Sequence, residues 1–125
     1  MGSGYLIDTN VIIDFSENKF PTTAQSFIAS IIDNDPVLSI INKIEILGFS
    51  SPNSVAVELV DYATVIGLSD DIINKTIAIR KVKRIKLPDA IIAATCVIHS
   101  LSLVTRNVFD FQNIKALKVI NPWEK

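Results

Sequence analysis

The chain has 125 residues, a length typical of one folding domain and short for two. Its composition is 49% hydrophobic and 20% charged, which excludes a disordered chain and favours a well-filled α/β interior. Twelve basic and thirteen acidic residues give a net charge of -1, so any attraction to a nucleic acid must come from a local basic patch. We therefore expect a single domain over residues 1–125.

Apolar segments typical of strands and of helices alternate along the chain. Tyr5–Ile7 predicts a strand that stops at the helix-capping residues Asp8, Thr9 and Asn10, after which a helix begins. The further predicted elements are a helix over residues 23–33, a strand over 37–41, a helix over 43–49 opened by Asn42, a helix over 55–62, a weak strand over 64–66, a helix from the capping residues 69–71 to about 83, a helix from 87 to near 99, and strands over 101–105 and 117–120.

Strands separated by ten or more helical residues need crossover connections, and these give a parallel sheet that is covered on both faces. We therefore expect a three-layer α/β/α sandwich with a central, mostly parallel sheet. The longest nearly apolar run, residues 90–98, is far shorter than the roughly 20 residues of a membrane-spanning helix, so it predicts a core helix and no membrane association. A lone cysteine, Cys96, and an N-terminus without signal-peptide features indicate a reducing, cytoplasmic setting.

Four acidic residues follow predicted strands or begin predicted helices. Asp8 follows the first strand, Glu45 lies in the first turn of the predicted 43–49 helix, Asp89 lies in the first turn of the last predicted helix, and Asp110 follows the strand that ends at Thr105. In an open parallel sheet such positions meet at the carboxyl edge of the strands, where these folds bind ligands. The pattern predicts that these carboxylates converge.

Converging carboxylates repel one another, and a divalent cation relieves that repulsion. Oxygen ligands without a histidine or cysteine cluster suit Mg²⁺ or Mn²⁺ rather than zinc. Such a site is well suited to phosphodiester hydrolysis. Each acid taken alone also fits a helix-stabilising role, since Asp8 follows a strand as an N-cap would, Glu45 is at capping-box spacing from Asn42, and Asp89 follows a proline in a first turn. The joint placement favours the metal site.

Three segments resemble the PIN-domain nucleases, and in particular the VapC-type toxins. They are LIDTNVIID at residues 6–14, NKIEILG at 42–48, and LPDAIIAAT at 87–95 followed by LVTRNVFDF at 103–111. The first is weakly specific alone, but all of them in order are strongly specific. The resemblance implies a compact α/β/α domain that binds Mg²⁺ or Mn²⁺, cleaves RNA to leave a 5′-phosphate and a 3′-hydroxyl, pairs with an antitoxin and forms a homodimer.

The resemblance also implies roles for individual residues. Asp8, Glu45 and Asp89 match the three principal acidic positions, whereas Asn107 stands where many relatives carry a fourth acid. Asn107 through its amide, or Asp110 through its charge, is the candidate to complete the site. Three polar residues are expected to orient the site or, equally, to cap helices: Thr9, Asn10 and Thr105.

Five of the seven residues 80–86 are basic and directly precede the helix that carries Asp89, which suggests a path for an RNA backbone. From this run we take Arg84 and Lys86 as RNA-binding candidates and add Arg106 beside the last motif; a solvated helix end is the alternative. Phe109 and Phe111 are expected to anchor a turn to the core rather than to stack on bases. His99 fits a helix end better than a catalytic role.

Three alternatives remain open at this point. The chain is either a toxin, a stand-alone PIN nuclease in RNA processing, or a degenerate domain that binds RNA or protein without cleavage, an option that Asn107 keeps open. A flavodoxin-like nucleotide-binding domain is disfavoured, because the four glycines do not cluster into a phosphate-binding loop.

Overall fold

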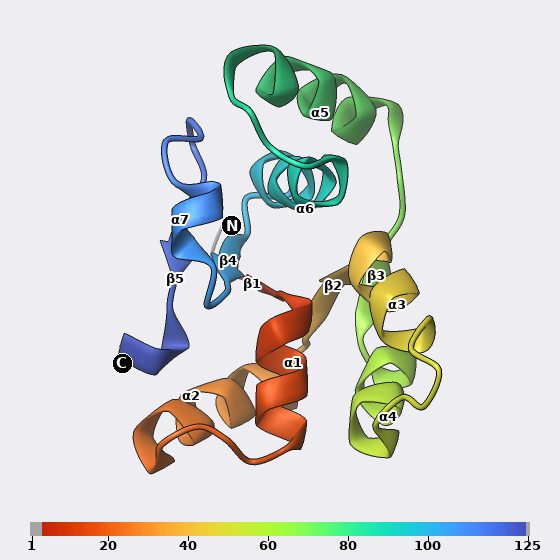
Figure 1. Ribbon diagram of the computed structural model, residues 1–125, viewed down its shortest axis with the longest axis vertical. Helices are drawn as coiled ribbons and strands as arrows, with labels where there is room; N and C mark the ends of the chain where they lie inside the picture. Colours follow the sequence, from red (N-terminus) through yellow and green to blue (C-terminus); the bar gives the residue numbers. More distant parts are fainter. Residues whose placement is uncertain (1–3, 125) are drawn as a thin grey trace.

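The computed structural model describes residues 4–124, in which helices separate five short strands (Figure 1). The strands are β1 (Tyr5–Ile7), β2 (Val37–Ser39), β3 (Thr64–Ile66), β4 (Ser102–Val104) and β5 (Val119–Ile120). The helices are α1 (Thr9–Ser16), α2 (Thr22–Asp33), α3 (Ile40–Leu47), α4 (Ser54–Tyr62), α5 (Asp70–Val82), α6 (Leu87–Ile98) and α7 (Val108–Phe111), followed by the 3-10 helix η1 (Pro122–Glu124).

The sheet has the order β3-β2-β1-β4-β5, and every pairing between neighbours is parallel. The predicted parallel α/β fold is therefore confirmed. From β1 the chain builds outward to β2 and β3 on one side, then crosses to β4 and β5 on the other. The gap between the ends of β1 and β4 is the switch point of the sheet, where folds of this kind bind their ligands.

Alternating side chains of the strands form two cores, one on each face of the sheet. Ile7 and Val104 pack with α1, α2 and α4 in the first core. Leu6 and Leu103 pack with α5 and α6 in the second. The two groups of helices lie on opposite sides of the sheet in Figure 1. This alternation is the period of two expected of a strand that is buried on both faces, and it produces the predicted three layers.

Helix α6 lies almost entirely inside the second core, as its apolar run predicts. Residues from Ala90 to Cys96 are buried apart from Ile91, and His99 is the residue that ends the helix, as expected. No helix within residues 4–124 combines the length and the apolar character that crossing a bilayer requires.

Several boundaries differ from those predicted: α3 spans residues 40–47 rather than 43–49, β5 begins at Val119 rather than at residue 117, and the short helix α7 was not predicted. The second strand stops at Ser39 rather than at residue 41, because Ser39 caps α3: its hydroxyl accepts from the Ile41 N–H at 3.0 Å, while Asn42 Oδ1 accepts from the Ser39 N–H at 2.9 Å. Asn42 is therefore the third residue of the helix, and Glu45 lies in its second turn rather than its first. Helix α2 begins after Pro21 without a side-chain cap.

Burial determines the chemistry of the lone cysteine. Cys96 is fully buried, and burial raises the pKa of its thiol well above the usual range. We expect the native protein at pH 8 to react with a thiol reagent such as dithionitrobenzoate at least about 100 times more slowly than the urea-unfolded chain, because only the exposed thiolate attacks. Equal rates in the two states would contradict this packing.

Candidate functional site

Asp8 stands at the carboxyl end of β1, at the switch point. Its N–H continues the sheet by donating to the Val104 carbonyl at 2.9 Å, and its Oδ1 caps α1 by accepting from the Thr9 N–H at 2.9 Å. Only 6% of the residue is exposed. Burial raises the pKa of Asp8, although its hydrogen bonds with Thr105, Thr9, Asn42 and Asn10 act in the opposite direction.

Side chains from three segments hold the Asp8 carboxylate in place. Thr105, which follows β4, donates its hydroxyl to Asp8 Oδ2 at 2.8 Å. Asn10 Nδ2 lies 3.3 Å from the same oxygen and 3.3 Å from Thr105 Oγ1. Asn42 Nδ2 reaches Asp8 Oδ1 at 3.3 Å. These bonds fix the carboxylate in one orientation, as polar residues around a metal ligand do.

Glu45 approaches Asp8 from α3. Thr9 donates its hydroxyl to Glu45 Oε1 at 2.6 Å, and the same hydroxyl accepts from Asn42 Nδ2 at 3.1 Å. Thr9 thus connects the first acid to the second. Because α3 begins at Ile40, Glu45 lies in the second turn of this helix rather than in the first. It nevertheless lines the same hollow as Asp8 at the end of β1.

Asp89 enters from the first turn of α6. Its pKa is raised, first by burial and then by the negative charges of Asp8, Asp110 and Glu45, while Lys86 lowers it. Three other carboxylates are therefore near enough to Asp89 to disfavour its ionised form. Asp8, Glu45 and Asp89 line one hollow of about 620 Å³.

The two candidates for completing the site lie on different sides of Asp89. Asn107 is exposed, lines the same hollow as the three acids, and donates its backbone N–H to Thr105 Oγ1 at 3.1 Å. Asp110, on α7, instead shares a neighbouring hollow with Asp89. The structure thus groups Asn107 with Asp8 and Glu45, and sets Asp110 beyond Asp89.

The oxygen atoms that line this hollow are of the type that binds hard divalent cations. Carboxylate and amide oxygens line it together, and a bound cation would relieve the charge repulsion that, after burial, raises the Asp89 pKa. Within residues 4–124 no group of three or more acidic, histidine or cysteine side chains is arranged closely enough to hold a metal ion as it stands. Asp8, Glu45 and Asp89 are the candidate ligands for such an ion.

Sequence reasoning missed Asp14, which lines the same hollow and is 5% exposed. Arg106 Nη1 donates to Asp14 Oδ2 at 2.6 Å, and the Arg106 N–H donates to Asn10 Oδ1 at 3.1 Å. Arg106 therefore ties the last motif to α1 by both backbone and side chain. The sequence could have indicated Asp14, because Asp14 lies four residues after Asn10 and therefore on the same face of the helix.

Asn42 was taken only as a helix start, yet it is fully buried and links Ser39, Asp8 and Thr9. An Asn42→Ala change would leave the buried Ser39 N–H without its acceptor and would remove the amide that donates to Asp8 Oδ1. We expect it to lower the free energy of unfolding by about 2 kcal/mol, measured by urea denaturation. A loss no larger than that of an exposed change such as Asn74→Ala would contradict the role of this amide.

Comparison with known proteins agrees with this architecture. The sequence profile of the PIN domain matches residues 5–116. A chain of a toxin–antitoxin complex from Klebsiella pneumoniae is 30% identical, with a TM-score of 0.76 over 95% of this chain and 98% of that one. FitAcB from Neisseria gonorrhoeae is 25% identical, with a TM-score of 0.74 over 97% and 99%. DNA-bound VapBC from Salmonella typhimurium is 21% identical and shares the fold, with a TM-score of 0.78 over 95% and 98%. A search of curated protein sequences found no match.

The parallel sheet, the acids at its carboxyl edge and the profile match together define the class: the chain belongs to the PIN domain family. Within that family it is similar to the VapC-type toxins, so the resemblance carried by the three sequence motifs is confirmed. PIN domains of the VapC type are nucleases.

Proposed function

We propose that this protein is a metal-dependent endoribonuclease and the toxin of a toxin–antitoxin pair. The observation that carries the proposal is the convergence of Asp8, Glu45 and Asp89, from three separate segments, on one hollow at the switch point of the sheet. In the proposed site these three carboxylates hold Mg²⁺ or Mn²⁺. A divalent cation bound there activates water and neutralises charge on the scissile phosphate.

The chain's own residues supply positioning. Thr105, Asn10 and Asn42 hold Asp8 in a single orientation, so little reorganisation is needed when substrate arrives. Thr9 holds Glu45 in the same way. Exposed Asn107 is proposed to contact the scissile phosphate through its amide, and Asp110 to tune the charge of Asp89.

An apolar groove supports an antitoxin as the partner. Phe15, Val55 and Tyr62, from α1 and α4, line this groove of about 220 Å³ together with Ile32 of α2. Such a groove fits the apolar face of a partner helix, and the similar structures include toxin–antitoxin complexes. The predicted homodimer has further exposed apolar residues available, such as Ile77 on α5, which is 50% exposed. We place this complex in the cytoplasm.

The test is cleavage by the purified chain, freed of any bound partner. Single-stranded RNA and DNA of the same mixed sequence are incubated with Mg²⁺, with Mn²⁺ and with EDTA. We expect internal cuts in the RNA with either metal and none with EDTA. Intact RNA under all conditions, with the protein folded by circular dichroism, would favour a binding domain without catalysis.

A further inference from the structure

A second hollow lies beside the acidic site and combines several cations, an exposed aromatic ring and two carboxylates. It has a volume of about 520 Å³, within the range of small-ligand sites. Arg84, Lys86, Phe109, Asp89 and Asp110 are among its lining residues. Asp89 lines the acidic hollow as well, so the two hollows share a wall.

Phe109 is the first unusual component of this hollow. The sequence predicted that it would anchor a turn to the core, as Phe111 does with 1% exposure, but that prediction is wrong for Phe109: it is 78% exposed. Helix α7 is a single turn, so burying Phe111 directs Phe109, two residues earlier, away from the core. No aromatic pair within residues 4–124 includes its ring, so its face is available for stacking.

The cations are the second component. Arg84 and Lys86 are exposed, and within residues 4–124 neither ion pair involves a residue of the basic run 80–86. This run contains no acid of its own, and the acids that line the hollow with it are Asp89 and Asp110. Lys86 is near enough to Asp89 to lower the pKa of that carboxyl. The cations thus reach the edge of the acidic site.

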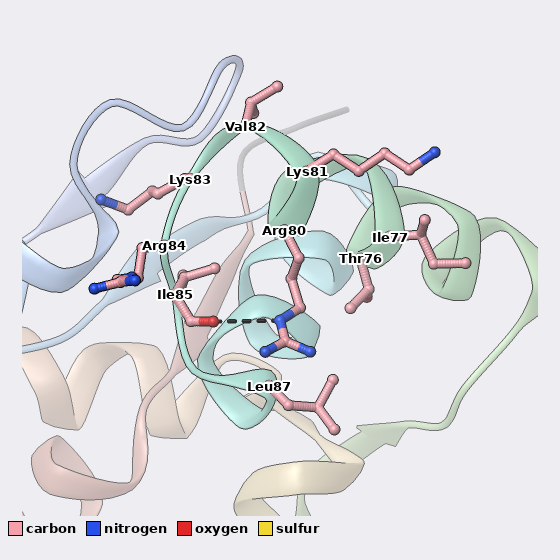
Figure 2. Close-up of a pocket in the computed structure, with 9 residues that line it drawn as sticks. All are labelled: Thr76, Ile77, Arg80, Lys81, Val82, Lys83, Arg84, Ile85 and Leu87. Carbon is pink, nitrogen blue, oxygen red and sulfur yellow. Dashed lines mark hydrogen bonds between the residues drawn. The ribbon is translucent and has the colours of Figure 1, made fainter.

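The basic run is also held in a defined shape. Arg80 Nε donates to the Ile85 carbonyl at 3.3 Å, which closes the turn between α5 and α6 (Figure 2). Figure 2 shows the Arg80 guanidinium pointing into an adjoining hollow above Leu87. Arg80, Lys83 and Arg84 line both that hollow and the one beside Asp89. Basic side chains therefore line both hollows and extend from the neighbourhood of Asp89 to the hollow above Leu87.

We propose that the hollow between residues 83–86 and α7 is a nucleotide subsite for the polynucleotide substrate, in which Phe109 stacks on a base and Arg84 and Lys86 bind flanking phosphates. This inference rests on the proposed function. Cations, an exposed ring and adjacent carboxylates suit one nucleotide next to a scissile phosphate. An acidic peptide would use the cations but would gain little from the ring.

Binding is measured by fluorescence anisotropy of a labelled eight-nucleotide single-stranded RNA in EDTA, so that cleavage is not required. Phe109→Ala is expected to weaken binding about tenfold without changing its salt dependence, while Phe109→Tyr, which keeps a ring, binds like the parent. Arg84→Gln/Lys86→Gln is expected to flatten the slope of log K against log salt by about 1.4, at about 0.7 for each phosphate contact. Lys19→Gln/Lys118→Gln is the control for removing two charges elsewhere and should leave the slope unchanged.

The subsite is overturned if Phe109→Ala binds like the parent, if the slope stays unchanged in the Arg84→Gln/Lys86→Gln variant, or if an octaglutamate peptide competes as well as unlabelled RNA. Cleavage of a longer RNA with Mg²⁺ separates the two proposals. If the parent binds in the predicted pattern but never cleaves, the subsite stands and the nuclease proposal fails. If it cleaves and the binding variants match the parent, only the subsite fails.

Discussion

Replacing Asp8 with asparagine is expected to abolish activity while making the metal-free protein more stable. Asparagine keeps the Oδ1 that caps α1 and accepts from Asn42, and it removes the buried charge. Its amide nitrogen replaces Oδ2, so it can donate to Thr105 Oγ1 but gives up the weaker bond from Asn10, a smaller loss than the cost of the buried charge that raises the Asp8 pKa. The loss of a metal ligand removes several kcal/mol of transition-state stabilisation, so cleavage should fall by roughly 100- to 1000-fold or more. Stability is compared by thermal unfolding in EDTA.

The pH dependence of that stability difference follows from the raised pKa. Folded Asp8 holds its proton to higher pH than the unfolded chain, whose value is near 3.8, so ionisation costs stability as pH rises through the folded pKa. The parent and Asp8→Asn should therefore differ least near pH 3 and most at neutral pH, with the variant more stable. Mg²⁺ at about 100 times its Kd should add about 2.7 kcal/mol to the parent alone. A less stable variant in EDTA at pH 7 would contradict this account.

The second large effect is expected at the Arg106–Asp14 pair. The Asp14 side chain is 7% exposed and its ion partner is Arg106 at 2.6 Å, so Arg106→Ala leaves a buried carboxylate without its charged donor. We expect a loss of about 2 kcal/mol in the free energy of unfolding, toward the middle of the range for charge-assisted hydrogen bonds, because half of the Arg106 side chain remains in solvent. Urea denaturation provides the measurement.

A double-mutant cycle separates this pair from a general loss of packing. Asp14→Asn/Arg106→Ala should be more stable than the sum of the two single changes predicts, with a coupling of at least about 0.5 kcal/mol. Additive effects would mean that the pair contributes nothing specific. A normal stability with weakened RNA binding would instead identify Arg106 as the free phosphate contact that the sequence suggested.

Much of this arrangement could be predicted from the sequence, because the relevant signals are local. Buried runs such as Tyr5–Ile7 mark strands, and a polar residue directly after a buried strand has to lie at the sheet edge. Asp8 was identified in this way, whereas Asn10 and Thr105 were expected beside it only from the resemblance; the structure brings all three within hydrogen-bonding distance of one another. The parallel sheet follows from the helical length of the connections.

Features set by tertiary contacts could not be predicted in the same way. The sequence analysis took Asn42 as the start of α3, whereas in the structure Ser39 is the N-cap and the buried Asn42 side chain accepts from the Ser39 N–H. The pairing of Arg106 with Asp14 spans 92 positions and depends on how β4 meets α1. The apolar pattern alone does not show which of Phe109 and Phe111 is buried. In the structure Phe111 lies in the core and Phe109 is exposed.

The most direct test of the central claim compares the parent with Asp89→Asn on one RNA in Mg²⁺. Asp89 is half-buried at the hollow's wall, and asparagine preserves its shape, so folding should be unchanged. The account predicts that the parent cuts the RNA, leaving 5′-phosphate ends, and that the variant is at least about 100 times slower at the same sites. Equal rates for the two proteins would contradict a metal site built on Asp8, Glu45 and Asp89.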